Sequence, residues 1–217
     1  MALVEFQNVT RVYKTGDHEL KALDGASFTL DEGKFVVILG PSGAGKSTLL
    51  NMLGGLDSPT NGKIVVGGKD ISTLTNNELA DYRASTVGFV FQFYNLIPTL
   101  TVKENVALVK EIAPGALSAE QMLAEVGLSD HLNNFPSELS GGMMRRVAIA
   151  RALAYKSKVL ILDEALRGLD EKNFENAVDV IERYRDGRTL ISVTHVVSRI
   201  EENADKFINL DKISENQ

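Results

Sequence analysis

A glycine-rich stretch with a single lysine is the strongest chemical signal in this sequence. Its spacing matches the pattern G-x-x-x-x-G-K-[ST], and its residues are Gly40, Pro41, Ser42, Gly43, Ala44, Gly45, Lys46, Ser47 and Thr48. An apolar run, Phe35–Leu39, precedes it, and a helical pattern follows it. In that setting backbone N–H groups close around phosphates, Lys46 reaches the β- and γ-oxygens, and the Ser47 hydroxyl binds Mg²⁺. We therefore predict a nucleotide site here; the alternative is a chance glycine turn.

Two adjacent carboxylates follow another apolar run. Asp163 and Glu164 come directly after Val159–Leu162, a run typical of a parallel strand buried on both faces. Open α/β sheets bind ligands at the carboxyl ends of their strands. We expect Asp163 to hold Mg²⁺, directly or through water, and Glu164 to polarise an attacking water as general base. The alternative is a pair of solvated carboxylates at a strand end.

Two further polar side chains end apolar runs in the same way. His195 follows Leu190–Thr194, and we expect it to contact a γ-phosphate; the alternative is a structural histidine. Gln92 follows Val87–Phe91, and from there it could reach Mg²⁺ or the attacking water. Because Gln92 also opens a segment of helical character, it is a candidate link between chemistry and movement.

A second candidate phosphate cradle carries no lysine. Ser140, Gly141 and Gly142 stand at the start of a run with helical character. A helix N-terminus presents free backbone N–H groups and the positive end of the helix dipole, both of which suit a phosphate.

Tyr13 is a candidate for contact with a purine ring. It lies in the expected turn Val12–Gly16. Its aromatic ring could stack on the base, or it could pack on the neighbouring antiparallel strands.

The spacing of apolar residues predicts an α/β chain with buried parallel strands. The first thirty residues alternate as half-buried strands do, and Ile64–Val66 reads as a strand before the Gly67-Gly68 turn. Helices are expected at Thr101–Ile112, Ala119–Val126, Gly141–Tyr155 and Glu171–Tyr184.

The composition narrows the class of protein. The chain of 217 residues is long enough for one sizeable core, and its 24% of charged residues is ordinary for a globular domain. A net charge of −6 argues against a nucleic-acid partner, and the absence of cysteine excludes disulfides and thiolate metal sites. No apolar run approaches the ~18–20 residues of a membrane span, and the N-terminus lacks a signal-peptide pattern. We expect a cytoplasmic protein.

Together and in this order, these pieces resemble the ATP-binding domain of ABC transporters. The resemblance rests on the glycine-rich loop, Gln92, the segment Leu139–Gly142, the carboxylates Asp163 and Glu164, the turn Gly168-Leu169-Asp170, and His195. It covers nearly the whole chain. Within the family, Gly54–Thr60 and Phe91–Leu96 resemble the branch that serves lipoprotein release, macrolide efflux, and antimicrobial-peptide or haem export.

The resemblance implies a fold for the whole chain. Residues 1–217 would form one ABC-type domain around a P-loop NTPase core of the RecA type, with a mainly parallel sheet and an N-terminal antiparallel β subdomain. Residues 1–92 and 156–217 would form that core, and residues 93–155 an inserted helical subdomain that carries the signature segment, Leu139, Ser140, Gly141, Gly142 and Met143.

The resemblance also implies a mechanism. Domains of this family pair head to tail as homodimers or heterodimers, with each ATP and its Mg²⁺ between the glycine-rich loop of one copy and the signature segment of the other. Gly168, Leu169 and Asp170 would lie at the dimer centre. ATP binding would close the dimer and move membrane permease subunits through a groove near Gln92, and hydrolysis would reopen it. The chain would lie peripherally on the inner face of the cell membrane.

Three features depart from the family pattern. Met143 stands where glutamine or glutamate is usual, and a thioether cannot donate a hydrogen bond to the partner's nucleotide. Ala165-Leu166 replace the usual Pro-Thr or Pro-Ser, which leaves the path of the turn to Asp170 open. The segment Met143–His195 is closer to importer-type ATPases than the exporter-like first half is. A recombined or engineered chain with impaired activity is therefore one alternative; a soluble, non-transport ABC ATPase and a small-molecule P-loop kinase are others.

Overall fold

The computed structural model describes residues 1–16, 18–113, 115–194 and 203–211. They divide into two compact units: unit 1 comprises Met1–Arg83 with Thr189–Gln217, and unit 2 comprises Ala84–Arg188. The division falls inside helix α2 (Asn76–Thr86). Over the described ranges, every helix is too short or too polar to cross a membrane.

Unit 1 begins with an antiparallel sheet of four strands in the order β2-β1-β4-β5. The strands are β1 (Ala2–Thr15), β2 (His18–Asp31), β4 (Asn61–Val66) and β5 (Lys69–Asp70). Their apolar residues alternate with polar ones, so that Val4, Phe6 and Leu30 are almost fully buried. The Phe6 and Phe28 rings stack with their centroids 4.6 Å apart. The predicted antiparallel part is therefore confirmed.

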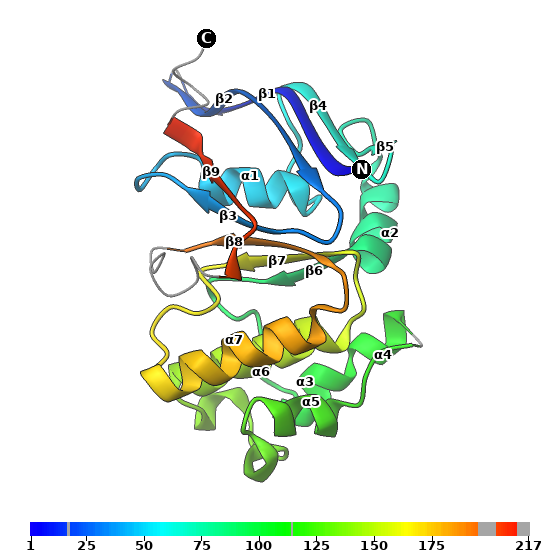
Figure 1. The fold of residues 1–217 in the computed structure, drawn as a ribbon, viewed down its shortest axis with the longest axis vertical. Helices are drawn as coiled ribbons and strands as arrows, with labels where there is room; N and C mark the ends of the chain where they lie inside the picture. The colour runs from blue at the N-terminus through cyan, green and yellow to red at the C-terminus, as the bar shows by residue number, and fades with distance from the viewer. Residues whose placement is uncertain (17, 114, 195–202, 212–217) are drawn as a thin grey trace. The chain divides into compact units, whose positions relative to one another are not determined.

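Three parallel strands complete unit 1. The first strand, β3 (Phe35–Leu39), pairs on one side with β8 (Thr189–Val193) and on the other with β9 (Lys206–Asn209). Val36, Val37 and Ile38 have no exposed surface, as expected for a strand covered on both faces. Helix α1 (Lys46–Leu53) lies between these strands and the antiparallel sheet (Figure 1).

Unit 2 contains two parallel strands. These are β6 (Val87–Val90) and β7 (Val159–Asp163), paired from Val87 opposite Val159 to Val90 opposite Leu162. Their register brings the residues that follow both strands to the same sheet edge. Both strands were predicted from their apolar runs.

The helices of unit 2 pack around α6. They are α3 (Val102–Ala107), α4 (Val109–Ile112), α5 (Ala119–Glu125), α6 (Gly141–Ala154) and α7 (Glu171–Arg185), with 3₁₀ turns at Ser129–His131 and Pro136–Glu138. Helices α6 and α7 run side by side, and α3 and α5 lie beside α6 (Figure 1). The fold class, α/β with parallel strands, an antiparallel part and a group of helices, is confirmed.

One predicted helix, Thr101–Ile112, is two short helices. The break comes at Leu108, whose carbonyl accepts from the Glu111 N–H at 3.1 Å. Such a bond to the third residue tightens the backbone locally and interrupts the α-helical pattern. The start at Thr101 is as expected, because Thr101 and Glu104 form a reciprocal capping box.

Three elements have no clear signal in the sequence. Helix α2 buries only Leu79 and Tyr82, so its apolar stripe is too thin to be seen in the pattern. Strand β5 has two residues, and β9 buries only Ile208. Pairing with an established strand, rather than local composition, determines β5 and β9.

Candidate functional site

The glycine loop, Gly40–Thr48, connects β3 to α1 in unit 1. The Lys46 side chain is buried and turns back along the loop, where its Nζ donates to the carbonyls of Gly40 and Pro41, both at 2.7 Å. The Ala44 N–H donates to the Pro41 carbonyl at 3.2 Å. The loop is thus curved around the lysine ammonium. Ser47 is exposed in the first turn of α1, where backbone N–H groups lack partners within the helix.

Gly45 is required by close backbone contact. It has φ +85° at the N-cap of α1, and a Cβ there would lie 2.1 Å from the Ala22 carbonyl oxygen of β2. Gly43 has the same φ, but nothing lies within 4 Å of a Cβ placed on it. The sequence pattern fixes a glycine at position 45 and leaves position 43 free, and the structure gives the reason: only at Gly45 would a side chain meet the backbone of another strand.

Tyr13 lies within strand β1, not in the expected turn. The strand continues to Thr15 because β1 and β2 pair up to His18. The Tyr13 hydroxyl donates to Asp57 at 2.6 Å, and the Arg11 guanidinium lies 4.6 Å from the centroid of its ring. These contacts favour the packing alternative for Tyr13, and a stacking role toward a purine stays a prediction.

Asp163 and Glu164 are held at the carboxyl edge of the β6-β7 pair. Asp163 is the last residue of β7 and is 7% exposed, while Glu164 is 8% exposed. Gln92 is half-buried and leaves the same edge two residues after β6. These three predicted residues therefore stand at the same edge of the sheet in unit 2.

Glu164 has an unusual backbone and a charged neighbour. Its φ is +51°, a left-handed conformation that is uncommon for a residue with a side chain. Its carboxylate accepts from the Arg167 guanidinium at 2.9 Å, and its carbonyl accepts from the Arg167 N–H at 3.1 Å. Residues 164–167 thus form a compact turn directly after the strand, along a path that the sequence had left open.

The signature segment, Leu139–Met143, starts helix α6 as predicted. Ser140 is the N-cap: its hydroxyl accepts from the Met143 N–H at 3.2 Å. Ser140 and Gly141 are exposed, whereas Leu139 is buried. The first turn of α6 is therefore open at its N-terminal end.

The turn Gly168–Asp170 leads into helix α7. Asp170 is its N-cap, and its carboxylate accepts from the backbone N–H and the side chain of Asn173 at 3.0 and 2.6 Å. These hydrogen bonds lower the pKa of Asp170. Gly168 has φ +74°. Asp170 thus caps the N-terminus of α7, independently of any role toward a partner.

Sequence reasoning missed a cluster of arginines on α6. Arg145 Nη1 donates to the carbonyls of Glu164, at 2.9 Å, and Arg167. Arg151 donates to the carbonyls of Tyr94 and Asn95 at 2.9 and 2.8 Å, and burial lowers its pKa. A signal was present: Arg145 shares a helix face with the buried residues Ala148, Ile149 and Ala152. A charge on an apolar face predicts a buried, partnered side chain.

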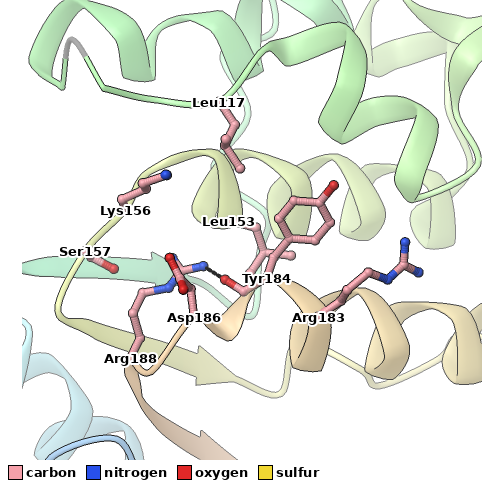
Figure 2. A pocket seen from close by; sticks show the side chains of 8 residues that line it. All are labelled: Leu117, Leu153, Lys156, Ser157, Arg183, Tyr184, Asp186 and Arg188. Atoms are coloured by element: carbon pink, nitrogen blue, oxygen red, sulfur yellow. Dashed lines mark hydrogen bonds between the residues drawn. The ribbon is translucent and has the colours of Figure 1, made fainter.

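A cavity of about 350 Å³ lies elsewhere in unit 2, near the ends of α6 and α7 (Figure 2). Its lining residues are Leu117, Leu153, Lys156, Ser157, Arg183, Tyr184, Asp186 and Arg188. Arg188 donates to the carbonyls of Tyr155, at 2.9 Å, and Tyr184, and Arg183 pairs with Glu125 at 2.6 Å. Because these two guanidinium groups already bind backbone carbonyls and a carboxylate of the chain itself, we assign the cavity a structural role.

The predicted residues are distributed over both units. Tyr13 and the glycine loop belong to unit 1, and the other described candidates belong to unit 2. His195 lies outside the described residues. The roles of these residues toward a ligand stay predictions.

A glycine loop between a parallel strand and a helix, together with carboxylates at another strand end, defines a P-loop NTPase. The family model described as "ABC transporter" matches residues 23–167. The chain belongs to the ABC transporter family. The resemblance inferred from the sequence is thereby confirmed.

Relatives and a solved structure agree with this assignment. The chain is 43% identical over 199 residues to the macrolide export ATP-binding/permease protein MacB of Hyphomonas neptunium. The aligned region covers 89% of this chain and 31% of that protein. It is 41% identical over 201 residues to the lipoprotein-releasing system ATP-binding protein LolD of Geobacter metallireducens, which covers 89% of each. The ATP-binding cassette MJ0796, in a dimeric post-hydrolysis state bound to ADP and Pi, superposes with a TM-score of 0.89 at 38% identity, over 95% of this chain and 93% of that one. The chain thus spans about a third of the length of the macrolide-export relative.

Proposed function

We propose that this chain hydrolyses ATP between two ABC-type domains and so powers transport through membrane permease subunits. One observation carries the proposal: the chain has a lysine-bearing phosphate loop and, separately, an exposed helix start at Ser140 without a lysine. Each half-site can form a complete ATP site when it pairs with the complementary half-site of a second copy. The dimeric state of MJ0796 with ADP and Pi supports this arrangement.

In this proposal the two half-sites contribute different contacts to the phosphates of one ATP. The Lys46 ammonium exchanges its neutral loop carbonyls for the β- and γ-phosphate oxygens, with which it forms hydrogen bonds whose donor and acceptor are both charged. Ser140 and the N–H groups at the start of α6 contact the γ-phosphate of the ATP held by the other copy. Closure of the dimer follows, because the phosphate then joins both partners.

Glu164 acts as the general base in this proposal, with Gln92 and His195 assisting. Glu164 stands at a strand end with its carboxylate only 10% exposed, and its turn fixes its direction. A carboxylate in such a position can orient a water and accept its proton. Gln92 leaves the same edge of the sheet and contributes an amide oxygen or N–H.

The donor set suits Mg²⁺ as well. Ser47, Asp163 and Gln92 offer hydroxyl, carboxylate and amide oxygens, the ligands that this hard cation prefers. Ser47 is exposed at the start of α1, and Asp163 closes a buried strand. Mg²⁺ held by ligands of this kind would neutralise charge on the β- and γ-phosphate oxygens.

The permease partner is proposed from the names of relatives. MacB is named as an ATP-binding/permease protein and LolD as the ATP-binding protein of a lipoprotein-releasing system. We propose that residues 93–155 form the helical subdomain through which a permease is moved. The chain would then sit on the inner face of the membrane through its partner, in the export branch of the family.

ATP turnover by Glu164→Gln tests the proposal. The amide cannot accept a proton, so we expect turnover to fall at least a hundredfold while ATP binding to the isolated chain is retained. Glu175→Gln is the matched control, because Glu175 is exposed on α7 and distant from the strand end in sequence. Wild-type turnover by Glu164→Gln would show that the general base is a different residue.

A further inference from the structure

Helix α6 carries a buried arginine that contacts two segments of the candidate site at once. Arg145 is 9% exposed and follows the signature segment by two residues. Its guanidinium reaches the turn after β7 on one side and Tyr94, two residues after Gln92, on the other. The ammonium of a lysine could not make both contacts, because the guanidinium is a planar group with five directed donors.

The contacts to the turn fix the backbone of Glu164. Arg145 Nη1 donates to the Glu164 carbonyl at 2.9 Å and also to the Arg167 carbonyl. These carbonyls flank the four-residue turn that begins with the left-handed Glu164. A left-handed residue with a side chain persists only where its surroundings enforce it. Arg145 supplies part of that enforcement, and the Arg167 side chain supplies another part at the carboxylate.

The contact to Tyr94 joins the same guanidinium to the segment after Gln92. Arg145 Nη2 donates to the Tyr94 hydroxyl at 3.4 Å, and the guanidinium carbon lies 5.2 Å from the centroid of the ring. Tyr94 has φ +59°, and Arg151 donates to its carbonyl at 2.9 Å. A Cβ on Gly141 would lie 3.2 Å from the Tyr94 hydroxyl, so this tyrosine also touches the start of α6.

We propose that Arg145 is a positioning residue for ATP hydrolysis, which sets the direction of Glu164 according to the position of the segment after Gln92. This proposal rests on the proposed function of Glu164 as general base. When Tyr94 moves with its segment, the guanidinium moves with it, and the carbonyls of Glu164 and Arg167 follow. Arg145 thereby makes turnover depend on the state of the Gln92 segment without touching ATP.

Steady-state kinetics of Arg145→Lys tests the proposal. Lysine keeps the charge and can hold one carbonyl, but it loses the contact with Tyr94 or with the turn. We expect kcat to fall about tenfold, with KM for ATP changed less than twofold, because ATP is held by the glycine loop. Arg146→Lys is the matched control: Arg146 is the next residue on α6 and donates to the Val126 carbonyl instead.

Tyr94→Phe keeps the proposal testable if Arg145→Lys folds poorly. Phenylalanine keeps the ring but loses the hydroxyl acceptor, and we expect kcat to fall about threefold. In the double variant that combines Tyr94→Phe with Arg145→Lys, the fold losses in kcat should not multiply. Both substitutions break the same contact between Arg145 and Tyr94, so their effects are not independent. Hydrogen exchange of the peptide that spans residues 163–170 should also accelerate in Arg145→Lys and stay unchanged in Arg146→Lys.

Three results would overturn this inference. They are a wild-type kcat for folded Arg145→Lys, a loss that appears only in KM, and an equal loss of kcat in Arg146→Lys. Glu164→Gln separates this failure from failure of the proposed function. If Glu164→Gln is inactive while Arg145→Lys has wild-type kcat, only the role of Arg145 is wrong; if Glu164→Gln is fully active, the general base itself is wrong.

Discussion

Replacing Gly45 with alanine should damage the glycine loop far more than replacing Gly43. Both glycines have φ +85°, so alanine at either position adopts a left-handed conformation at a cost of about 1–2 kcal/mol. Only at Gly45 does the new methyl group meet an obstacle. Its carbon would lie 2.1 Å from the carbonyl oxygen of Ala22, which belongs to strand β2.

The clash at Gly45 adds a second energetic cost to that of the left-handed backbone. Van der Waals contact requires roughly 3.5 Å between a carbon and another heavy atom, so the start of α1 and β2 must separate by more than 1 Å. Overpacking of that kind costs about 1–3 kcal/mol. We therefore expect Gly45→Ala to lower the free energy of unfolding by about 2–5 kcal/mol, and Gly43→Ala by about 1–2 kcal/mol.

Urea unfolding of the two variants, each followed by calorimetric titration with ATP, provides the measurement. The structure predicts a clearly lower unfolding midpoint for Gly45→Ala, and a larger loss of ATP affinity because the N-terminus of α1 is displaced. Equal midpoints for the two variants would refute the reasoning, since both would then report only the backbone conformation.

Three further predictions concern unit 2. Asn105 is fully buried and hydrogen-bonds the backbone of Ile97 through both its Oδ1 and its Nδ2. Asn105→Ala should therefore lower the free energy of unfolding, measured by urea titration, by about 2–4 kcal/mol, and a decrease below about 1 kcal/mol would contradict this. Hydrogen bonds from Asn173 lower the pKa of Asp170, so its stabilisation is complete above the unfolded value of ~3.9 and is lost as pH falls below it. Asp170→Asn keeps a capping side chain and should show a shallower acid limb of stability against pH; identical limbs would exclude this contribution. Met143→Gln should tighten the ATP-bound dimer by about 0.5–1.5 kcal/mol in a dimerisation titration, and no change would mean that the position only packs.

The strand ends could be predicted because their signals are local. A short, fully apolar run such as Val159–Leu162 is typical of a strand buried on both faces, and the polar residue after such a strand stands at the sheet edge. The glycine loop and Ser140 carry their own signals in the same way, through turn geometry and helix capping. These residues therefore needed no knowledge of distant contacts.

The arginine contacts could not be predicted, because their partners are far away in the chain. Arg145 reaches Glu164 across 19 residues and Tyr94 across 51 residues. Its place on the apolar face of α6 predicts burial, but many acceptors would satisfy a buried guanidinium equally well. Tyr13 was misplaced for a related reason: the length of β1 is set by its pairing with β2.

The central claim is that the helix start at Ser140 serves the ATP held by a second copy of the chain. Mixing two inactive variants tests it most directly. Lys46→Ala removes the lysine of the loop, and Ser140→Arg blocks the start of α6, so each variant alone should be inactive. In a mixed dimer, one site combines the intact loop of one chain with the intact signature segment of the other.

ATP turnover of the equimolar mixture is therefore the decisive measurement. We predict recovery to about a quarter of wild-type turnover if the sites act independently, because half of random dimers are mixed and each has one intact site of two. Turnover equal to the average of the two separate variants would contradict the account, because loop and signature would then serve the same chain.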